Sequence, residues 1–169
     1  MVRKALWVVL LGFAVLFVGS ITPGFAEEKV IINGIDANFP PFAFVDKTGK
    51  PDGFDVAVVD LIAKEIGCKV EHKPMDWDGI IPSLNARKID MIASGMSITD
   101  ARKEQVNFSI PYWDIIQVLV AKADPGITPE DAMKEGKKIG VQRGTTEAKW
   151  IEENLVKKQG KKFELVYYD

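Results

Sequence analysis

The 169-residue chain is poor in the side chains that build metal centres and covalent cross-links, with one cysteine, Cys68, and one histidine, His72. A single cysteine excludes an intrachain disulfide. A lone histidine gives no indication of a metal site or of a histidine-based catalytic triad. Zinc-ligand spacings, phosphate loops and nucleophile elbows are also lacking. We therefore expect no metal, no cofactor and no catalytic residue.

The chain also lacks a strong excess of charge of either sign. It carries 22 basic and 24 acidic residues, for a formal net charge of −2. Nucleic-acid-binding domains are usually basic, so this balance predicts no nucleic-acid partner. The length suffices for an ordinary domain with a core of its own.

One long apolar run is present, at residues 5–19, and it follows Arg3 and Lys4. Small residues at 24–26 then precede Glu27. This layout predicts a signal peptide over residues 1–26 and an exported, periplasmic or extracellular protein. The alternative is an uncleaved membrane anchor, although the run is short against the roughly 20 residues that span a bilayer. No cysteine stands at the cleavage site, so a lipid anchor is not indicated.

The remaining pattern alternates between strands and helices. We expect helices over residues 55–66, 99–106 and from 128 and 144 onward, with a short one after Asp78. We expect strands over residues 29–35, 69–74, 89–93, 115–122, 138–142 and 163–168. Repeated βα units predict an α/β fold with mainly parallel sheets that are covered by helices on both faces. The pattern stops on a bare strand, which we interpret as a truncated chain.

The most informative segment is SGMSITDAR, residues 94–102, which follows an expected strand. Its small residues allow a ligand to approach the backbone, its hydroxyls can donate, and Arg102 fits a carboxylate bidentately. These features predict a site for a small anion. The same residues are also typical of a strand-to-helix turn in which Thr99 caps the next helix, and the segment alone leaves both interpretations open.

Five segments in register resemble one known family. They are GIDANFPPF (34–42), GFDVAVVDL (53–61), WDGIIPSL (77–84), SGMSITDAR (94–102) and GVQRGTTE (140–147). Together they are similar to the polar amino-acid-binding branch of the periplasmic (extracellular) solute-binding proteins, which are the receptors of ABC importers. The resemblance covers residues 29–169.

The resemblance implies a type II periplasmic-binding-protein-like fold of two α/β lobes with the ligand held between them. It places the first lobe at residues 27–114, a crossing strand at the hinge at 115–122, and an incomplete second lobe at 123–169. The later part of the second lobe supplies the family's acidic partner for the α-ammonium of the ligand, and this chain shows no counterpart for it.

The resemblance also implies a set of binding residues. Those in the first lobe are Asp36 for the polar end of the ligand, Phe39 and Trp77 as aromatic walls, Ser94, Gly95 and Ser97 for the α-amino and carboxylate groups, and Arg102 for the α-carboxylate. Each also has a simpler structural interpretation, because Asp36 suits a turn and the aromatic residues suit a core.

In the second lobe the resemblance implies that Thr145 and Thr146 donate to the same carboxylate as the cleft closes. A helix that begins there would favour an anion, although a plain threonine cap is the alternative. Gln142 would help to set the ligand preference, together with Arg143. Glu147 stands where some relatives carry glutamine, and it receives no role.

The expected function is a non-enzymatic receptor that binds a small polar L-amino acid and delivers it to an ABC permease. Two alternatives remain. One is an exported enzyme similar to cyclohexadienyl dehydratase, which shares the fold. The other is the ligand-sensing module of a membrane-anchored protein, with residues 5–21 as the anchor.

Overall fold

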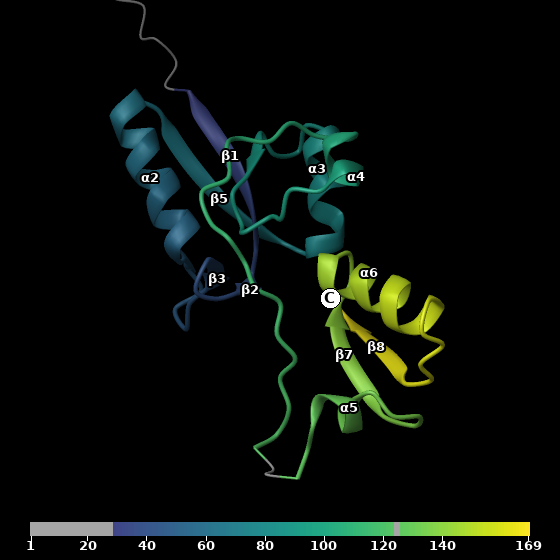
Figure 1. The fold of residues 1–169 in the computed structure, drawn as a ribbon. Coiled ribbons are helices and arrows are strands. Elements are labelled where there is room, and N and C mark those ends of the chain that lie inside the picture. Colours follow the sequence, from purple (N-terminus) through teal and green to yellow (C-terminus); the bar gives the residue numbers. More distant parts are fainter. Residues whose placement is uncertain (1–28, 124–125) are drawn as a thin grey trace, which may run out of the picture.

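The computed structural model describes residues 29–123 and 126–169. The expected signal peptide lies outside the described residues. The chain forms two α/β lobes that are joined by a long connecting segment, residues 104–123 (Figure 1). None of the helices in the described ranges has the length and apolarity needed to cross a bilayer.

The first lobe is built on a parallel sheet in the order β5-β1-β6. Its strands are β1 (Val30–Asp36), β5 (Lys69–Met75) and β6 (Met91–Ile92). Helices α2 (Phe54–Ile66) and α3 (Ile80–Asn85) lie on either side of this sheet (Figure 1). Ile35 packs against Val56 of α2, whereas Ile32 packs into the cluster around Ile80 of α3. This arrangement follows from the two-residue period of a strand, which sends Ile32 and Ile35 to opposite faces.

The sequence around α2 explains where the helix begins and ends. Gly53 precedes it, and Gly67 follows in the left-handed conformation, with φ of 71°. The Gly67 N–H bonds to carbonyl groups of the last turn, as glycine at this position usually does. Val56, Val59 and Ala63 form the buried face. The helix predicted for residues 55–66 is confirmed to within one residue.

A small antiparallel sheet accompanies the first lobe. It contains β2 (Asn38–Phe39), β3 (Ala43–Val45) and β4 (Pro51–Asp52), in that order. The polar turn between β3 and β4 is tied by Asp46, which accepts backbone N–H bonds from Thr48 and Lys50. One carboxylate therefore holds this turn.

Two elements at the cleft are shorter than expected. The strand predicted for residues 89–93 pairs with β1 only over Met91–Ile92, because the next N–H, of Ala93, bonds to the Asn33 side chain. The helix predicted for residues 99–106 is α4 (Asp100–Lys103). Thr99 does cap it, with its side chain accepting from Arg102 N.

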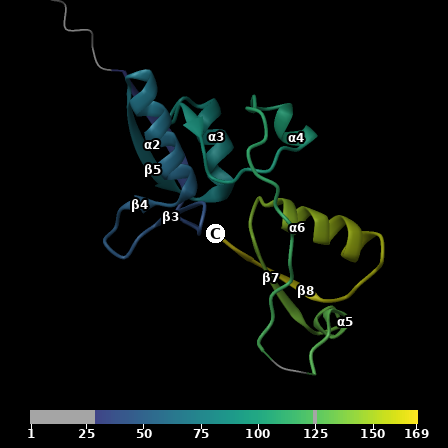
Figure 2. The ribbon, with the colours of Figure 1, turned by 60° about the vertical axis from the view of Figure 1, so that its left-hand side comes forward.

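The second lobe contains the parallel strands β7 (Lys138–Gln142) and β8 (Glu164–Tyr168), as expected. Helix α5 (Pro129–Ala132) opens with the predicted cap at Thr128. Helix α6 (Thr146–Ile151) continues into a π-helical turn, η2 (Glu152–Lys157), and both lie beside the sheet (Figure 2). The core of the second lobe is apolar and comprises Ile139, Val141, Ala148, Leu155 and Phe163.

The connecting segment differs from expectation. Residues 115–122, predicted as a crossing strand, form no strand pairing with the described residues. They run as an extended link between the lobes (Figure 1). Ile116, Val118 and Val120 are 86%, 77% and 84% exposed, so this β-branched stretch has nothing packed against one of its faces.

Candidate functional site

A cleft of about 220 Å³ lies between the two lobes. All ten residues that the sequence nominated for ligand binding line it: Asp36, Phe39, Trp77, Ser94, Gly95, Ser97, Arg102, Gln142, Thr145 and Thr146. The structure therefore brings together residues from both lobes and from four of the five motif segments. Their role in binding stays a prediction.

Asp36 stands at the carboxyl end of β1, and only 3% of it is exposed. Its Oδ1 accepts from the backbone N–H of Asn38, which makes the Asx turn that the sequence suggested. Its Oδ2 accepts from Nε2 of Gln142 in the second lobe, at 2.9 Å. The Asp36 carboxylate is thus held from both sides and forms a link between the lobes.

The loop after β6 is held by buried polar groups. Ser94 Oγ accepts from the Asp36 N–H at 2.9 Å, and Asp55 Oδ2 accepts from the Gly95 N–H at 2.6 Å. Burial raises the pKa of the Asp55 carboxyl, whereas its bonds with Tyr112 and Gly95 oppose that rise. These bonds fix the backbone that faces the cleft.

Gly95 is required by both conformation and space. Its φ is +58°, and a Cβ at this position would lie 2.5 Å from the ring of Phe39. Left-handed backbone of this kind is costly for other residues. The glycine therefore lets Phe39 lie directly over the loop, where the ring also stacks on Phe42 at a centroid distance of 5.3 Å.

Arg102 reaches from α4 across the cleft. Its Nη1 donates to Ser97 O at 2.8 Å, and its Nη2 donates to Gly144 O of the second lobe at 3.2 Å. The guanidinium also lies over the ring of Trp77, 5.5 Å from the centroid. Burial lowers the pKa of Arg102, an effect that the Glu147 carboxylate opposes. A guanidinium has five N–H donors, so groups remain that can bind a carboxylate.

Trp77 both packs in the core and lines the cleft, which are the two interpretations that the sequence left open. It is 9% exposed and packs in a core cluster with Ile80 and Ile89. It also lines the cleft beneath Arg102. One side chain therefore serves the core and the cleft wall together.

The hydroxyl groups of the second lobe are already engaged. Thr145 Oγ1 accepts from Ala148 N as the N-cap of α6 and donates to Gln142 O at 2.8 Å. Thr146 Oγ1 donates to Glu147 Oε2 at 3.2 Å. The geometry of a threonine cap is thus present at Thr145. A ligand would therefore have to bind the backbone of Thr145, or replace the Gln142 carbonyl as the acceptor of the Thr145 hydroxyl.

Four further residues line the cleft that were not expected from the sequence: Ile115, Gly140, Val141 and Glu147. Gly140 and Val141 belong to β7, which ends at Gln142, so their place follows from the strand direction. Glu147 stands next to two nominated residues, which was a usable signal. It brings a second carboxylate into the cleft beside Asp36.

Among residues 29–123 and 126–169, no group of three or more histidine, cysteine or acidic side chains is arranged to hold a metal ion. The residues that line the cleft instead carry one guanidinium, two carboxylates, one amide, four hydroxyl groups and two aromatic rings. A set of this kind can hold a small zwitterion.

Residues 31–164 match the bacterial extracellular solute-binding proteins, family 3. The chain belongs to this family. The L-cystine-binding protein TcyJ of Escherichia coli K12 is 37% identical over 131 residues, which are 76% of this chain and 49% of TcyJ. The ABC transporter arginine-binding protein 1 of the same organism is 35% identical over 134 residues, 79% of this chain and 54% of the relative.

A solved structure extends this comparison. An ancestral amino-acid-binding protein, described as a precursor of cyclohexadienyl dehydratase, is 40% identical with a TM-score of 0.71. The match covers 82% of this chain and 60% of that protein. The chain spans about half the length of the curated relatives given above. The two-lobed family fold predicted from the sequence is therefore confirmed for the part that the chain contains.

Proposed function

We propose that this chain binds a small polar L-amino acid in the cleft between its lobes. As an exported receptor, it would present that ligand to the membrane permease of an ABC importer. The main support for this proposal is that residues expected to bind the ligand form contacts between the two lobes. Gln142 bonds to Asp36, and Arg102 bonds to Gly144 O, so polar groups of the two lobes already contact each other across the cleft.

The cleft offers partners for the α-carboxylate, the aliphatic stem and the polar end of an amino acid. Arg102 supplies a fork of donors for the α-carboxylate. Phe39 and Trp77 supply apolar walls for an aliphatic stem. Asp36 and Glu147 supply negative charge, which favours a ligand with a cationic or amide end. The cystine-binding and arginine-binding names of the relatives agree with a ligand that carries more than one polar group.

We propose binding without catalysis. General acid–base chemistry needs a titratable side chain that is free to exchange a proton with the substrate, and the candidates among the residues that line the cleft are the carboxyl groups of Asp36 and Glu147. Both oxygens of Asp36 accept hydrogen bonds in the structure, and Glu147 bonds to Thr146. The dehydratase precursor among the neighbours favours enzymatic turnover as a second candidate. Incubation with a cyclohexadienyl acid, followed by mass spectrometry, distinguishes the two, since only an enzyme would release carbon dioxide and water.

The test of the binding proposal is calorimetric titration of the purified chain with L-arginine, L-cystine and L-glutamine in turn. Arg102→Ala should weaken the strongest of these interactions by about 10- to 150-fold, the equivalent of a charge-assisted hydrogen bond of about 1.5–3 kcal/mol. Arg102→Lys should recover part of the loss, because it keeps the charge without the fork.

Lys103→Ala is the matched control, since it removes one positive charge from the same helix at an exposed position. It should leave the affinity within about twofold of the parent, which is under 0.5 kcal/mol. Binding that survives Arg102→Ala unchanged would remove Arg102 from the site. Heat signals that are absent for all the amino acids tested would overturn the proposed function.

A further inference from the structure

The buried polar residues of the described chain gather around one short loop. They are Asn33, Asp36, Asp55 and Ser94, and each is at most 3% exposed. They fix three successive residues after β6 through the bonds Ala93 N–H to Asn33, Asp36 N–H to Ser94, and Gly95 N–H to Asp55. Buried polar groups must be paired, so this loop holds its position through these bonds. Ser94 and Gly95 line the cleft.

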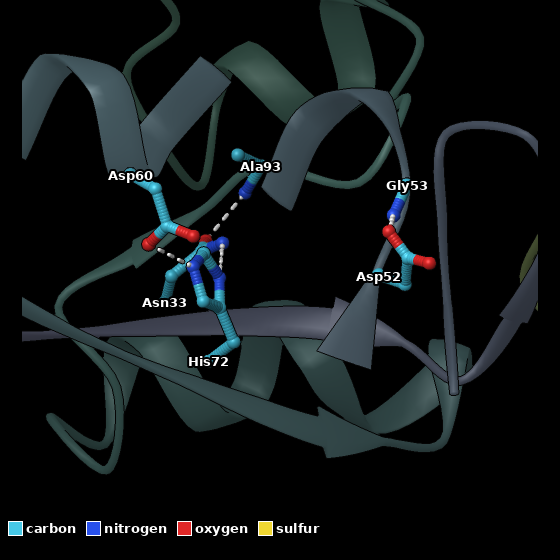
Figure 3. Close-up of polar contacts among 6 residues, drawn as sticks. All are labelled: Asn33, Asp52, Gly53, Asp60, His72 and Ala93. Carbon is cyan, nitrogen blue, oxygen red and sulfur yellow. Dashed lines mark hydrogen bonds and ion pairs between the residues drawn. The ribbon is translucent and has the colours of Figure 1, made fainter. Parts of the chain in front are cut away.

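One of these anchors continues to the surface through the only histidine of the chain. Figure 3 shows Ala93, Asn33, His72 and Asp60 joined one to the next by hydrogen bonds, and this row is contributed by the residue after β6, by β1, by β5 and by α2. Asn33 Oδ1 accepts from the Ala93 N–H at 2.7 Å, which leaves Nδ2 to face His72 Nδ1 at 3.0 Å. His72 Nε2 lies 3.1 Å from Asp60 Oδ1.

The backbone amide sets the direction of every bond in this row. A backbone N–H can only donate, so the Asn33 oxygen faces Ala93 and the Asn33 amino group faces the histidine. The amino group can only donate in turn, so His72 Nδ1 must accept, and its proton sits on Nε2, where it bonds to Asp60. All four groups are satisfied when His72 is neutral.

The charges around His72 come from few directions. Asp60 of α2 is the ion-pair partner, and its side chain is 58% exposed, whereas that of His72 is 8% exposed. Glu71 and Lys73 neighbour His72 on β5, and the strand period directs them to the other face. β1 contributes the uncharged Asn33. On β4, Asp52 bonds to the Gly53 N–H, away from the row (Figure 3).

Protonation of His72 places a proton on Nδ1, which then faces the Asn33 amino group donor to donor. The Asn33 amide can turn its oxygen to the imidazolium, but its amino group then faces the Ala93 N–H, and the loop loses its anchor. Histidine is the side chain that changes charge in the range of about pH 5 to 8.

We propose that His72 is a positioning residue that makes the ligand-facing loop at Ser94 and Gly95 sensitive to pH. The neutral ring holds Asn33 so that Asn33 holds Ala93, and acidification loosens the loop and lowers ligand affinity. The effect on affinity rests on the proposed function. The effect on the loop itself does not, and the two are measured separately.

The first measurement follows the loop without a ligand. Amide hydrogen exchange is recorded by NMR at pH 8 and pH 5, and the Ala93 N–H is expressed as a protection factor, which corrects for the intrinsic effect of pH. In the parent, protection of Ala93 should fall roughly two- to tenfold on acidification, the loss of one hydrogen bond. In His72→Gln, which cannot titrate, it should stay constant.

The sharpest variant is Asn33→Asp. A carboxylate can accept from Ala93 and from a protonated His72 together, so acidification should preserve or strengthen the Ala93 bond. Asp60→Asn is the matched control, because its amide oxygen still accepts from Nε2. It should keep the loss of Ala93 protection on acidification.

The second measurement is the affinity for L-arginine, whose own charge is constant over this range, at the same two pH values. The parent should lose roughly two- to tenfold, and His72→Gln should not. If no L-arginine binds at either pH, the proposed function fails for this ligand, while the exchange data still decide the inference. Identical pH profiles of Ala93 protection in the parent and in His72→Gln would overturn it, whether or not Asn33→Asp folds.

Discussion

Gln142 donates a hydrogen bond from Nε2 to Oδ2 of Asp36 at 2.9 Å, although the two residues are 106 positions apart in the chain. Gln142 is the last residue of β7 in the second lobe, and Asp36 is the last residue of β1 in the first. The carboxyl ends of two strands from different lobes therefore face each other. This is where ligands usually bind to open parallel sheets.

Removal of this bond should weaken ligand binding. Gln142→Ala removes a hydrogen bond that joins the two lobes at the cleft. If ligand binding requires the lobes to meet there, the loss costs the bound form about 1–3 kcal/mol, so we expect L-arginine affinity to fall by roughly 5- to 150-fold in calorimetry. Asp36→Asn removes the charge but can keep the geometry. The oxygen of the new amide can still accept from the Asn38 N–H, and its amino group can donate to the Gln142 oxygen if the Gln142 amide turns over. This variant should weaken L-arginine binding more than L-glutamine binding. Equal losses for both ligands would show that the charge of Asp36 has no part in selection.

Gly95→Ala should disturb the cleft without unfolding the lobe. The added Cβ would lie 2.5 Å from the Phe39 ring, and the backbone at φ of +58° costs an alanine about 1–2 kcal/mol. We expect a lower midpoint of urea unfolding and a displaced Phe39 signal in NMR spectra. Gly49→Ala is the control, since φ there is +84° but no atom lies within 4 Å of the added Cβ. A Phe39 signal that moves equally in both variants would contradict the contact.

Asp55 should make the stability of the first lobe depend on pH. Because burial raises the pKa of its carboxyl above the ordinary value of 3.8, the folded state binds this proton more tightly than the unfolded state. The resulting stabilisation is complete below about pH 3.8 and is lost as the pH rises through the raised pKa. Urea unfolding midpoints measured across this window should show the loss.

In Asp55→Asn the same window should be flatter, since the amide does not titrate and its oxygen can still accept from the Gly95 N–H. Asp100→Asn is the control, because the Asp100 side chain is 98% exposed. It should leave the pH profile of the parent unchanged. If Asp55→Asn shows the same dependence of the unfolding midpoint on pH as the parent, groups other than Asp55 cause that dependence.

The exposed face of the connecting segment should promote self-association. Ile116, Val118 and Val120 alternate along an extended backbone that forms no strand pairing with the described residues, which is the pattern of an unprotected edge strand. We expect light scattering to show a mass that rises with concentration. Val118→Lys should lower that mass, because an edge lysine opposes pairing. Ile66→Lys adds the same charge at another exposed apolar position and should not. Equal effects of the two variants would point to net charge alone.

Local patterns in the sequence predicted most elements of the fold. The bounds of α2, its end at Gly67, the Thr128 cap and the bounds of β7 all depend on residues a few positions apart. Such features are set by backbone geometry and side-chain period. The strand predicted for residues 89–93 is longer than the observed β6. Its backbone pairing with β1 stops where the Ala93 N–H bonds to the side chain of Asn33, 60 positions away. A long-range bond of this kind leaves no local signal.

The sequence by itself indicated the α/β order of the elements and the resemblance to the family, and that resemblance implied ten of the fourteen residues that line the cleft, because they lie in short motifs whose residues can be compared directly. Only the tertiary structure decided which hydrogen bonds these residues form. The link from Gln142 to Asp36, the place of Glu147 beside Arg102 and the row from Ala93 to Asp60 each join segments that meet through packing. Hydrogen-bond direction, burial and pKa depend on which groups lie within a few ångströms of each other, and chain order alone does not fix those neighbours.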